Sequence, residues 1–297
     1  MEFSTMTAIE IANGIREGDL TSEGVTRVCL ERIDALEEKV QAWAWLERAY
    51  AIEQACRADR SRAKGESLGP LHGVPVGIKD IIDTRDMPTE YGTPVYSGWQ
   101  PNRDATVVSH LRAAGAVILG KTVTAELAYY TPGKTRNPHN PAHTPGGSSS
   151  GSAAAVASGM VPLAVGTQTN GSVIRPAAFC GTIGFKPTHG RISRHGVLHQ
   201  SWLLDQMGVF GNTVDDVALL AEALMSFDER DPDMRPFPRP ALREALAMPS
   251  DWKPHLGFVR SPVWDLSEED TRRGFQELSG RLPGLVTEVT LPACFDE

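Results

Sequence analysis

The spacing of apolar residues predicts helices at the start of the chain. From Val25 to Leu36, apolar side chains recur on one face of a helix, and Thr21 or Ser22 stands where a capping residue is expected. A further helix is predicted over residues 49–62, because its pattern stops just before a glycine. The first 65 residues are therefore expected to be helical.

Further along, short apolar runs alternate with helix-like segments. The runs predict buried strands at 74–78, 116–119, 161–165 and 182–185. Helices are expected between them, at 106–114 and 152–158. This alternation predicts an α/β fold, with a large mixed β-sheet flanked by helices on both faces.

The chain after residue 225 differs in composition from the part before it. Five prolines and many charges between 226 and 250 indicate a surface excursion, and a strand, a helix and a strand are then expected at 255–260, 268–281 and 285–291. The predicted organisation is one domain over residues 1–297. Its parts are N-terminal helices (1–65), a catalytic core (66–225), the excursion (226–250) and an incomplete C-terminal part (251–297).

Composition narrows the classes of protein. The chain has 297 residues, 41% of them hydrophobic, and a net charge of −8, which favours a globular protein and disfavours a nucleic-acid partner. Its four cysteines show no metal-binding spacing and fit a reducing compartment. We see no signal peptide and no apolar run of ~18 residues. A cytoplasmic protein without a membrane partner is expected, and a homodimer stays open.

Three short patterns match known motifs without the context that those motifs need. Residues 115–122 fit the phosphate-loop expression, but their middle positions are apolar and predict a core strand that carries Lys121. Residues 147–151 fit the nucleophile-elbow expression around Ser149, but three prolines precede them where a central strand is required. His195 and His199 lie four apart, but they lack the glutamate of a zinc helix, so we expect no metal.

A fourth pattern is more informative. A loop rich in glycine and serine at 145–152 leads into a helix of small residues, and a second glycine-containing turn carries Ser172. A third unusual segment, residues 73–80, is an apolar strand that ends at Lys79. Tight packing explains the glycines. It does not explain two serine loops flanking one strand, together with a lysine in an apolar setting.

These segments resemble the amidase signature family, from about residue 8 to 225 and more weakly to 295. The resemblance covers several blocks, namely 71–80, 120–128, 145–188, 186–191, 201–205 and 213–216. It implies an amidase with Ser172 as nucleophile, Ser148 as proton bridge and Lys79 as base, without metal or organic cofactor. It also implies an oxyanion hole made by backbone amides of Thr169, Asn170, Gly171 and Ser172.

The chemistry of these residues is consistent with that resemblance. A serine hydroxyl needs an adjacent base to become a strong nucleophile, and no histidine lies in either loop. Lysine can be that base if its pKa falls from ~10.4 to ~7–8, which costs roughly 4 kcal/mol. Burial in the apolar strand at 74–78 supplies such a shift. The alternative for Lys79 is a structural ion pair with Asp80.

Three residues depart from the common family pattern. Asn170 stands where glycine is usual, so the turn either tolerates it or is strained. Gln168 replaces an aspartate, and Arg175 lies three residues after Ser172 rather than two. The last two features resemble the malonamidase-like branch, in which the arginine faces a substrate carboxylate. We therefore predict Arg175 and Gln168 as substrate-binding residues for a small anionic amide; the alternative for Arg175 is a structural ion pair.

The leading hypothesis is hydrolysis of a small-molecule amide through an acyl-serine intermediate. Two alternatives remain: an amidotransferase A-type subunit that works with partner subunits, and a non-catalytic family member that binds a ligand or partner. Members of the family usually continue beyond the length of this chain. The sequence is therefore expected to be a C-terminally truncated form, either a fragment of a longer reading frame or a weakly stable protein with an exposed sheet edge.

Overall fold

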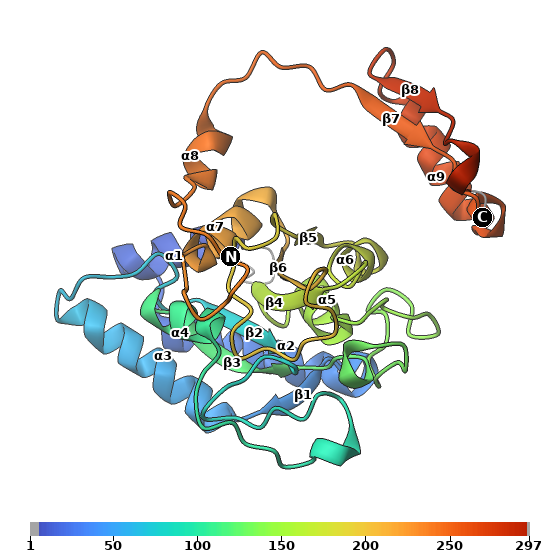
Figure 1. Ribbon diagram of the computed structural model, residues 1–297. Helices are drawn as coiled ribbons and strands as arrows, with labels where there is room; N and C mark the ends of the chain where they lie inside the picture. Colours follow the sequence, from blue (N-terminus) through green and yellow to red (C-terminus); the bar gives the residue numbers. More distant parts are fainter. Residues whose placement is uncertain (1–5, 296–297) are drawn as a thin grey trace. The chain divides into compact units, whose positions relative to one another are not determined.

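The computed structural model describes residues 6–295, and the chain divides into two compact units, Met1–Leu246 and Ala247–Glu297 (Figure 1). The division falls inside the proline-rich segment 226–250. The sequence predicts one domain with an excursion at that segment, whereas the structure separates two units there.

The N-terminal region contains three helices and one strand. The helices are α1 (Ala8–Glu17), α2 (Ser22–Val40) and α3 (Arg48–Ala63), and the Thr21 side chain caps α2 as predicted. The expectation that the first 65 residues are all helical is wrong at β1 (Trp43–Leu46). Two tryptophans favour extended backbone there, and Trp43 is buried against the sheet.

The first unit is built on a six-stranded mixed sheet with the order β1-β3-β2-β4-β6-β5. The remaining strands are β2 (Pro75–Lys79), β3 (Val117–Thr122), β4 (Leu163–Gln168), β5 (Ile183–Phe185) and β6 (Gln206–Gly211). The central strands β3, β2 and β4 run parallel, and β1, β6 and β5 are antiparallel to their neighbours. This confirms the predicted mixed sheet.

The parallel pairing of β2 with β4 positions the candidate site. Ile78 is the partner of Val165, so Lys79 and Thr167 both lie near the carboxyl ends of their strands, and their side chains meet there. Neighbouring parallel strands bring the loops after them to one edge of a sheet, which is where ligands of α/β proteins usually bind. Lys79 therefore lies at the edge from which the Ser172 turn departs.

Helices cover both faces of the sheet, as predicted. The first unit also contains α4 (Thr106–Ala113), α5 (Ser150–Ala157), α6 (Ile174–Cys180), α7 (Val214–Leu224) and the short helices η2 (Pro94–Tyr96) and η3 (Glu126–Ala128). Buried residues of α1, α4 and α7 pack with Val165 in one core, and those of α2, α5 and α6 pack with Ala164 in another. Successive residues of β4 thus face opposite cores.

Helix α5 brings the serine loop close to the sheet because its side chains are small. A Cβ atom on Gly151 would lie 2.3 Å from the carbonyl oxygen of Ala42, so no larger residue fits without a shift of backbone. The helix is buried along most of its length, and Ser148 stands just before it. The run of Ser, Gly and Ala is therefore the reason that Ser148 reaches the end of β2.

The second unit contains a parallel strand pair joined through a helix. Its strands β7 (Leu256–Val259) and β8 (Val286–Val289) flank α9 (Glu269–Gly280), together with η4 (Trp264–Leu266) and η5 (Ala293–Phe295). This confirms the strand–helix–strand order predicted for 255–291. A short helix, α8 (Leu242–Ala247), lies within the segment predicted as an excursion.

Candidate active site

Lys79 is the last residue of β2, and its side chain is fully buried, with 0% exposed. Its Nζ atom lies 2.8 Å from the Ser148 hydroxyl oxygen and 2.8 Å from the Thr167 hydroxyl oxygen. Both partners are uncharged. The structure therefore brings together two of the three residues predicted for catalysis, in a setting that gives an ammonium ion no carboxylate in direct contact.

The surroundings of Lys79 favour its neutral form. Burial lowers the pKa of the Lys79 amine well below its usual value, and the charge of Asp205 opposes this shift. A lysine with a lowered pKa releases its proton at a lower pH than a lysine in solvent. The amine is thus suited to accept a proton from Ser148.

The alternative of an ion pair between Lys79 and Asp80 is wrong. Asp80 instead pairs with Lys121 on the neighbouring strand, at 3.0 Å between Nζ and Oδ1, and both side chains are buried. Lys121 also donates to the Thr89 hydroxyl at 2.6 Å. The two buried lysines thus differ in their partners. Lys121 contacts a carboxylate and a hydroxyl group, whereas Lys79 contacts two hydroxyl groups.

The strand that carries Lys121 also excludes the interpretation of residues 115–122 as a phosphate-binding loop. Residues 117–122 form β3, so the middle of the motif is extended backbone and not a phosphate-binding turn. The ammonium group of Lys121 is held by Asp80 inside the protein. The prediction of a core strand carrying Lys121 is confirmed.

The loop that carries Ser148 is held against the end of β4. The hydroxyl of Ser149 donates to the carbonyl oxygen of Thr167 at 3.1 Å, which commits this group to the backbone. The Ser149 amide donates to the carbonyl oxygen of Ser172 at 3.4 Å. No strand is assigned between residues 129 and 149, as predicted, so the nucleophile-elbow match has no structural basis.

Ser172 lies on the turn between β4 and α6 and is 5% exposed. Among the described residues, the amide groups of Asn170, Gly171 and Ser172 find no hydrogen-bond acceptor. Consecutive unpaired amides are what an oxyanion hole requires. The oxyanion role of this turn, with Thr169 at its start, stays a prediction with which this arrangement is consistent.

Asn170 introduces no backbone strain into the turn. Asn170 is absent from the described residues with positive φ, and Gly171 likewise has no left-handed backbone. Asn170 is also exposed. Since the turn needs no left-handed residue at this point, asparagine replaces glycine there without a conformational cost.

The buried side chain of Gln168 bonds to the backbone at the far end of the same turn. Its side-chain oxygen accepts hydrogen bonds from the amides of Val173 at 2.9 Å and Ile174 at 3.0 Å, and the residue is 5% exposed. These bonds position the start of α6 relative to the end of β4. They occupy the side-chain oxygen, so the predicted contact of Gln168 with substrate is left to its NH₂ group and stays a prediction.

Asp205 is a residue of the site that sequence reasoning did not single out. Its carboxylate accepts from the Thr169 hydroxyl at 2.7 Å and from the amides of Gln200 at 2.7 Å and Ser201 at 2.9 Å. It thereby joins the turn that carries Ser172 (residues 169–172, called the nucleophile turn below) to the loop before β6. The recognised block at 201–205 contained the residue, but a linear pattern does not reveal a partner more than thirty positions away.

Arg194 holds that loop from the other side. Its Nη1 atom donates to the carbonyl oxygens of Trp202 at 2.7 Å and Asp205 at 3.4 Å. The same guanidinium forms a buried ion pair with Asp231 at 2.8 Å. The charged segment after α7, interpreted from the sequence as surface, therefore supports the site through Arg194.

Asparagine in place of Asp205 is expected to shift the pH dependence of catalysis to lower pH. The charge of Asp205 raises the pKa of Lys79, so its removal lowers that pKa further. Since the reactive amine is the deprotonated one, activity rises with pH through the pKa of Lys79. The rise should therefore occur at lower pH in Asp205→Asn.

Profiles of kcat/KM against pH check this prediction. Asp215→Asn, which removes an exposed carboxylate at the start of α7, is the control and should leave the rise where it is. A rise that stays in place or moves to higher pH in Asp205→Asn would contradict the electrostatic role given to this residue.

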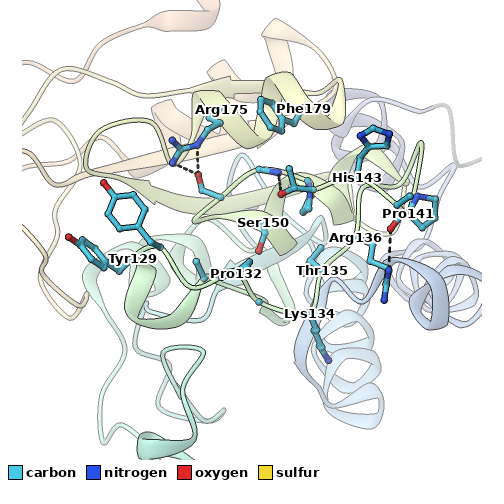
Figure 2. Close-up of a pocket in the computed structure, with 18 residues that line it drawn as sticks. Tyr129, Pro132, Lys134, Thr135, Arg136, Pro141, His143, Ser150, Arg175 and Phe179 are labelled. Atoms are coloured by element: carbon cyan, nitrogen blue, oxygen red, sulfur yellow. Dashed lines mark hydrogen bonds between the residues drawn. The ribbon is translucent and has the colours of Figure 1, made fainter. Parts of the chain in front are cut away.

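A cavity of about 620 Å³ lies beside the Ser148 loop and includes Gly147 and Ser150 in its wall (Figure 2). Its lining contains the cationic residues Lys134, Arg136 and Arg175 and no Asp or Glu. Within the described part of the chain, no carboxylate lies at ion-pair distance from Arg175, which leaves the alternative of a structural ion pair without support. The cavity thus presents positive charge beside Gly147, the residue before Ser148, while Ser148 and Ser172 themselves are not part of its wall.

His199, one of the two histidines spaced four apart, has an aromatic neighbour. It stacks on Trp202, with 4.0 Å between ring centroids.

Residues 6–295 contain no group of three or more His, Cys, Asp or Glu that could hold a metal ion. Over the same residues, no helix combines the length and the apolar character that crossing a bilayer requires.

Comparison with known proteins places this geometry in a family. The family model described as Amidase matches residues 24–292. In Streptomyces avermitilis, the A-type subunit of glutamyl-tRNA(Gln) amidotransferase is 45% identical over 295 residues, covering 97% of this chain and 59% of that protein. The corresponding protein of Streptomyces coelicolor is 45% identical over 261 residues, covering 86% of this chain and 52% of that protein.

Solved structures agree with the sequence relatives. The peptide amidase from Stenotrophomonas maltophilia superposes with a TM-score of 0.86 at 32% identity, over 98% of this chain and 63% of that one. The 6-aminohexanoate cyclic dimer hydrolase, complexed with its substrate, superposes with a TM-score of 0.83 at 26% identity, over 97% of this chain and 61% of that one. None of these four proteins is named a malonamidase, so the resemblance to that branch stays a prediction.

The relatives are longer proteins than this chain, which spans 59% of the Streptomyces avermitilis protein and 63% of the peptide amidase. The shared part includes the mixed sheet, both serine loops and Lys79. Because the family model matches from residue 24 to 292, and the fold agrees with solved amidases, this chain belongs to the amidase family, as the sequence predicts.

Proposed function

We propose that this chain hydrolyses the C–N bond of a small-molecule amide through an acyl-serine intermediate. One observation carries the proposal: the Lys79 amine is fully buried and contacts two hydroxyl groups, one of them that of Ser148. The Ser149 amide also donates to the carbonyl oxygen of Ser172, which links the loop of Ser148 to the turn that carries Ser172.

In the first step, the Ser172 oxygen attacks the carbonyl carbon of the amide. Its proton passes to the Ser148 oxygen, and the Ser148 proton passes to the neutral amine of Lys79. Lys79 becomes an ammonium ion at this point, and the carbonyl oxygen takes up negative charge. The Thr167 hydroxyl, at 2.8 Å from Nζ, can accept a hydrogen bond from that ammonium.

The negative charge on the carbonyl oxygen needs donors that are already in place. The unpaired amides of Asn170, Gly171 and Ser172 supply them, and removal of one such donor typically costs roughly 3 kcal/mol of barrier. Thr169 begins the same turn and is held by Asp205 through its side chain. The fixed turn therefore costs little reorganisation as the charge develops.

Collapse of the tetrahedral intermediate breaks the C–N bond. The leaving nitrogen takes a proton that returns from the Lys79 ammonium through Ser148, and the acyl group stays on Ser172 as an ester. Water then attacks the ester while the same relay accepts its proton. The carboxylic acid leaves, and Ser172 and the neutral amine of Lys79 are restored.

Trapping of the acyl-enzyme tests this proposal. A slow amide substrate should release ammonia or amine, and intact-mass analysis of the quenched protein should show the acyl mass, which peptide mapping places on Ser172. Well-folded protein that gives neither product nor adduct with a panel of amides, or with a fluorophosphonate, would favour the non-catalytic alternative.

For the substrate, we propose a small amide that bears a carboxylate. The support is the cavity beside Gly147, whose lining carries Lys134, Arg136 and Arg175 and no acidic residue, in a protein with a net charge of −8. A charge-assisted hydrogen bond contributes about 1.5–3 kcal/mol, which corresponds to roughly 10- to 100-fold in affinity.

Malonamate is therefore expected to react with a kcat/KM at least about tenfold above that of butyramide, a neutral amide of similar size. Steady-state assays at several salt concentrations measure the ratio, and it should fall as salt rises because part of the attraction is screened. Equal specificity constants for the two amides at low salt would reject the anionic substrate.

A second candidate function is that of an amidotransferase A-type subunit. The observation that favours it is the 45% identity to proteins of that name. Hydrolysis of small amides by the chain alone supports the first candidate. Ammonia release from glutamine that appears only when the other subunits of such an enzyme are added would support the second.

A further inference from the structure

We infer that Arg175 is a positioning residue that clasps the two serine loops together. This inference rests on the proposed function, because it concerns the geometry between Ser148 and Ser172. It gives Arg175 a task inside the protein, in addition to any contact with a substrate carboxylate.

The contacts of Arg175 reach both loops. Its Nε and Nη2 atoms donate to the carbonyl oxygen of Gly147 at 3.1 and 2.9 Å, and Gly147 directly precedes Ser148 (Figure 2). Its own amide donates to the carbonyl oxygen of Gly171 at 2.9 Å, directly before Ser172. That backbone bond ties residue 175 to the Ser172 turn, and the guanidinium then links this backbone to the loop of Ser148.

The side chain also lies over the nucleophile turn. A Cβ atom on Gly171 would be 3.6 Å from the Arg175 guanidinium carbon, which is ordinary van der Waals contact. Next to Arg175, the backbone of Pro176 is close to the other loop: a Cβ atom on Gly146 would be only 2.9 Å from the Pro176 Cα atom. The loop before Ser148 therefore packs closely on the start of α6. The guanidinium thus spans a close contact between the two loops.

The direct backbone link between the loops is weaker than the bonds that Arg175 forms. The Ser149 amide and the Ser172 carbonyl are 3.4 Å apart, beyond the usual 2.7–3.2 Å of N–H···O bonds. The two bonds from Arg175 Nε and Nη2 to the Gly147 carbonyl oxygen, which together form a fork, are within that range. The charge of the donor strengthens them. The two bonds of the Arg175 guanidinium therefore restrain the distance between the serine loops, in addition to the bonds that join Ser149 to Thr167 at the end of β4.

The experiment compares Arg175→Met and Arg175→Lys with Arg239→Met. Arg239 is a matched control, since its Nε and Nη2 atoms form the same fork on one carbonyl oxygen, that of Glu222, on an exposed surface of α7. For Arg175→Met we expect kcat to fall roughly 100-fold on butyramide and malonamate alike, because small misplacements of reacting groups have effects of this size. Arg175→Lys, which keeps one donor, should recover part of the loss, and Arg239→Met should lose none.

A second readout does not depend on turnover. Amide hydrogen exchange at Ser149 should become faster in Arg175→Met than in wild type, and it should be unchanged in Arg239→Met. If Arg175→Met does not fold, the same comparison is made with Arg175→Lys, for which a smaller increase is expected. Faster exchange in a protein that shows no amidase activity would uphold the clasp and reject the proposed function.

The clasp is overturned by either of two results. One is a loss confined to malonamate and expressed in KM, with kcat on butyramide intact, which would make Arg175 a carboxylate-binding residue only. The other is unchanged exchange at Ser149 in folded Arg175 variants.

Discussion

Ser172→Ala is expected to lower the rate of amide hydrolysis by about 10⁴- to 10⁶-fold, the range seen when a serine nucleophile is removed from a hydrolase. The variant lacks the oxygen that attacks the carbonyl carbon, and the hydroxyl of Thr169 on the same turn is committed to a hydrogen bond with Asp205. Among the described residues, the Ser172 hydroxyl has no hydrogen-bond partner, so the free energy of unfolding should change by less than about 0.5 kcal/mol.

Single-turnover rates and thermal melting check both parts of this prediction. Ser152→Ala is the control, because this buried hydroxyl donates to the carbonyl oxygen of Val165 at 3.2 Å and lies outside the relay. It should reduce stability by about 1 kcal/mol and leave the rate per folded molecule within about threefold. A Ser172→Ala variant that keeps more than about 1% of the wild-type rate would require a different nucleophile.

Lys79→Met is expected to lower kcat/KM by about 10³- to 10⁴-fold while leaving the protein at least as stable as wild type. The loss of activity follows from removal of the base that accepts the Ser148 proton. The effect on stability follows from linkage. Because burial lowers the pKa of Lys79, the unfolded chain binds more protons than the folded one between the folded pKa and ~10.4.

In that pH window the wild-type protein should gain stability as pH rises, and at neutral pH it carries the cost of deprotonating Lys79. Methionine removes this cost and fills a similar volume. Denaturant unfolding at several pH values therefore should show a smaller increase of stability with pH in Lys79→Met than in wild type.

Lys121→Met is the matched comparison, since this lysine is equally buried on the adjacent strand. Its removal leaves the Asp80 carboxylate without its partner at 3.0 Å, which is expected to cost about 3–5 kcal/mol of stability. The two lysine variants should thus differ in kind: one loses catalysis and the other loses stability. Equal effects on stability would contradict the distinction between their environments.

The sequence is sufficient to predict the elements whose pattern is local. The helix after Thr21, the strand that ends at Lys79 and the small-residue helix after Ser148 follow from capping, apolar runs and residue size within a few positions. The proximity of Lys79 to Ser148 could be predicted because both belong to a recognisable set of segments. The Ser148 hydroxyl indeed lies 2.8 Å from the amine.

Contacts between distant segments could not be predicted in this way. Asp80 pairs with Lys121 rather than Lys79, because the register of β2 against β3 decides which side chains share a face. Asp205 meets Thr169 only after β6 pairs with β4. The fork of Arg175 on Gly147 is another example, since residue type identifies a donor but not its acceptor.

The central claim is that the amine of Lys79 is neutral inside the folded protein. The most direct test is an NMR titration of the lysine side-chain Nζ and Cε signals, with Lys79 assigned by its absence in Lys79→Met. We predict a midpoint well below the ~10.4 of a solvated lysine, because burial disfavours the charged amine. A Lys79 signal that stays charged through neutral pH and titrates at or above ~10.4 would contradict the account.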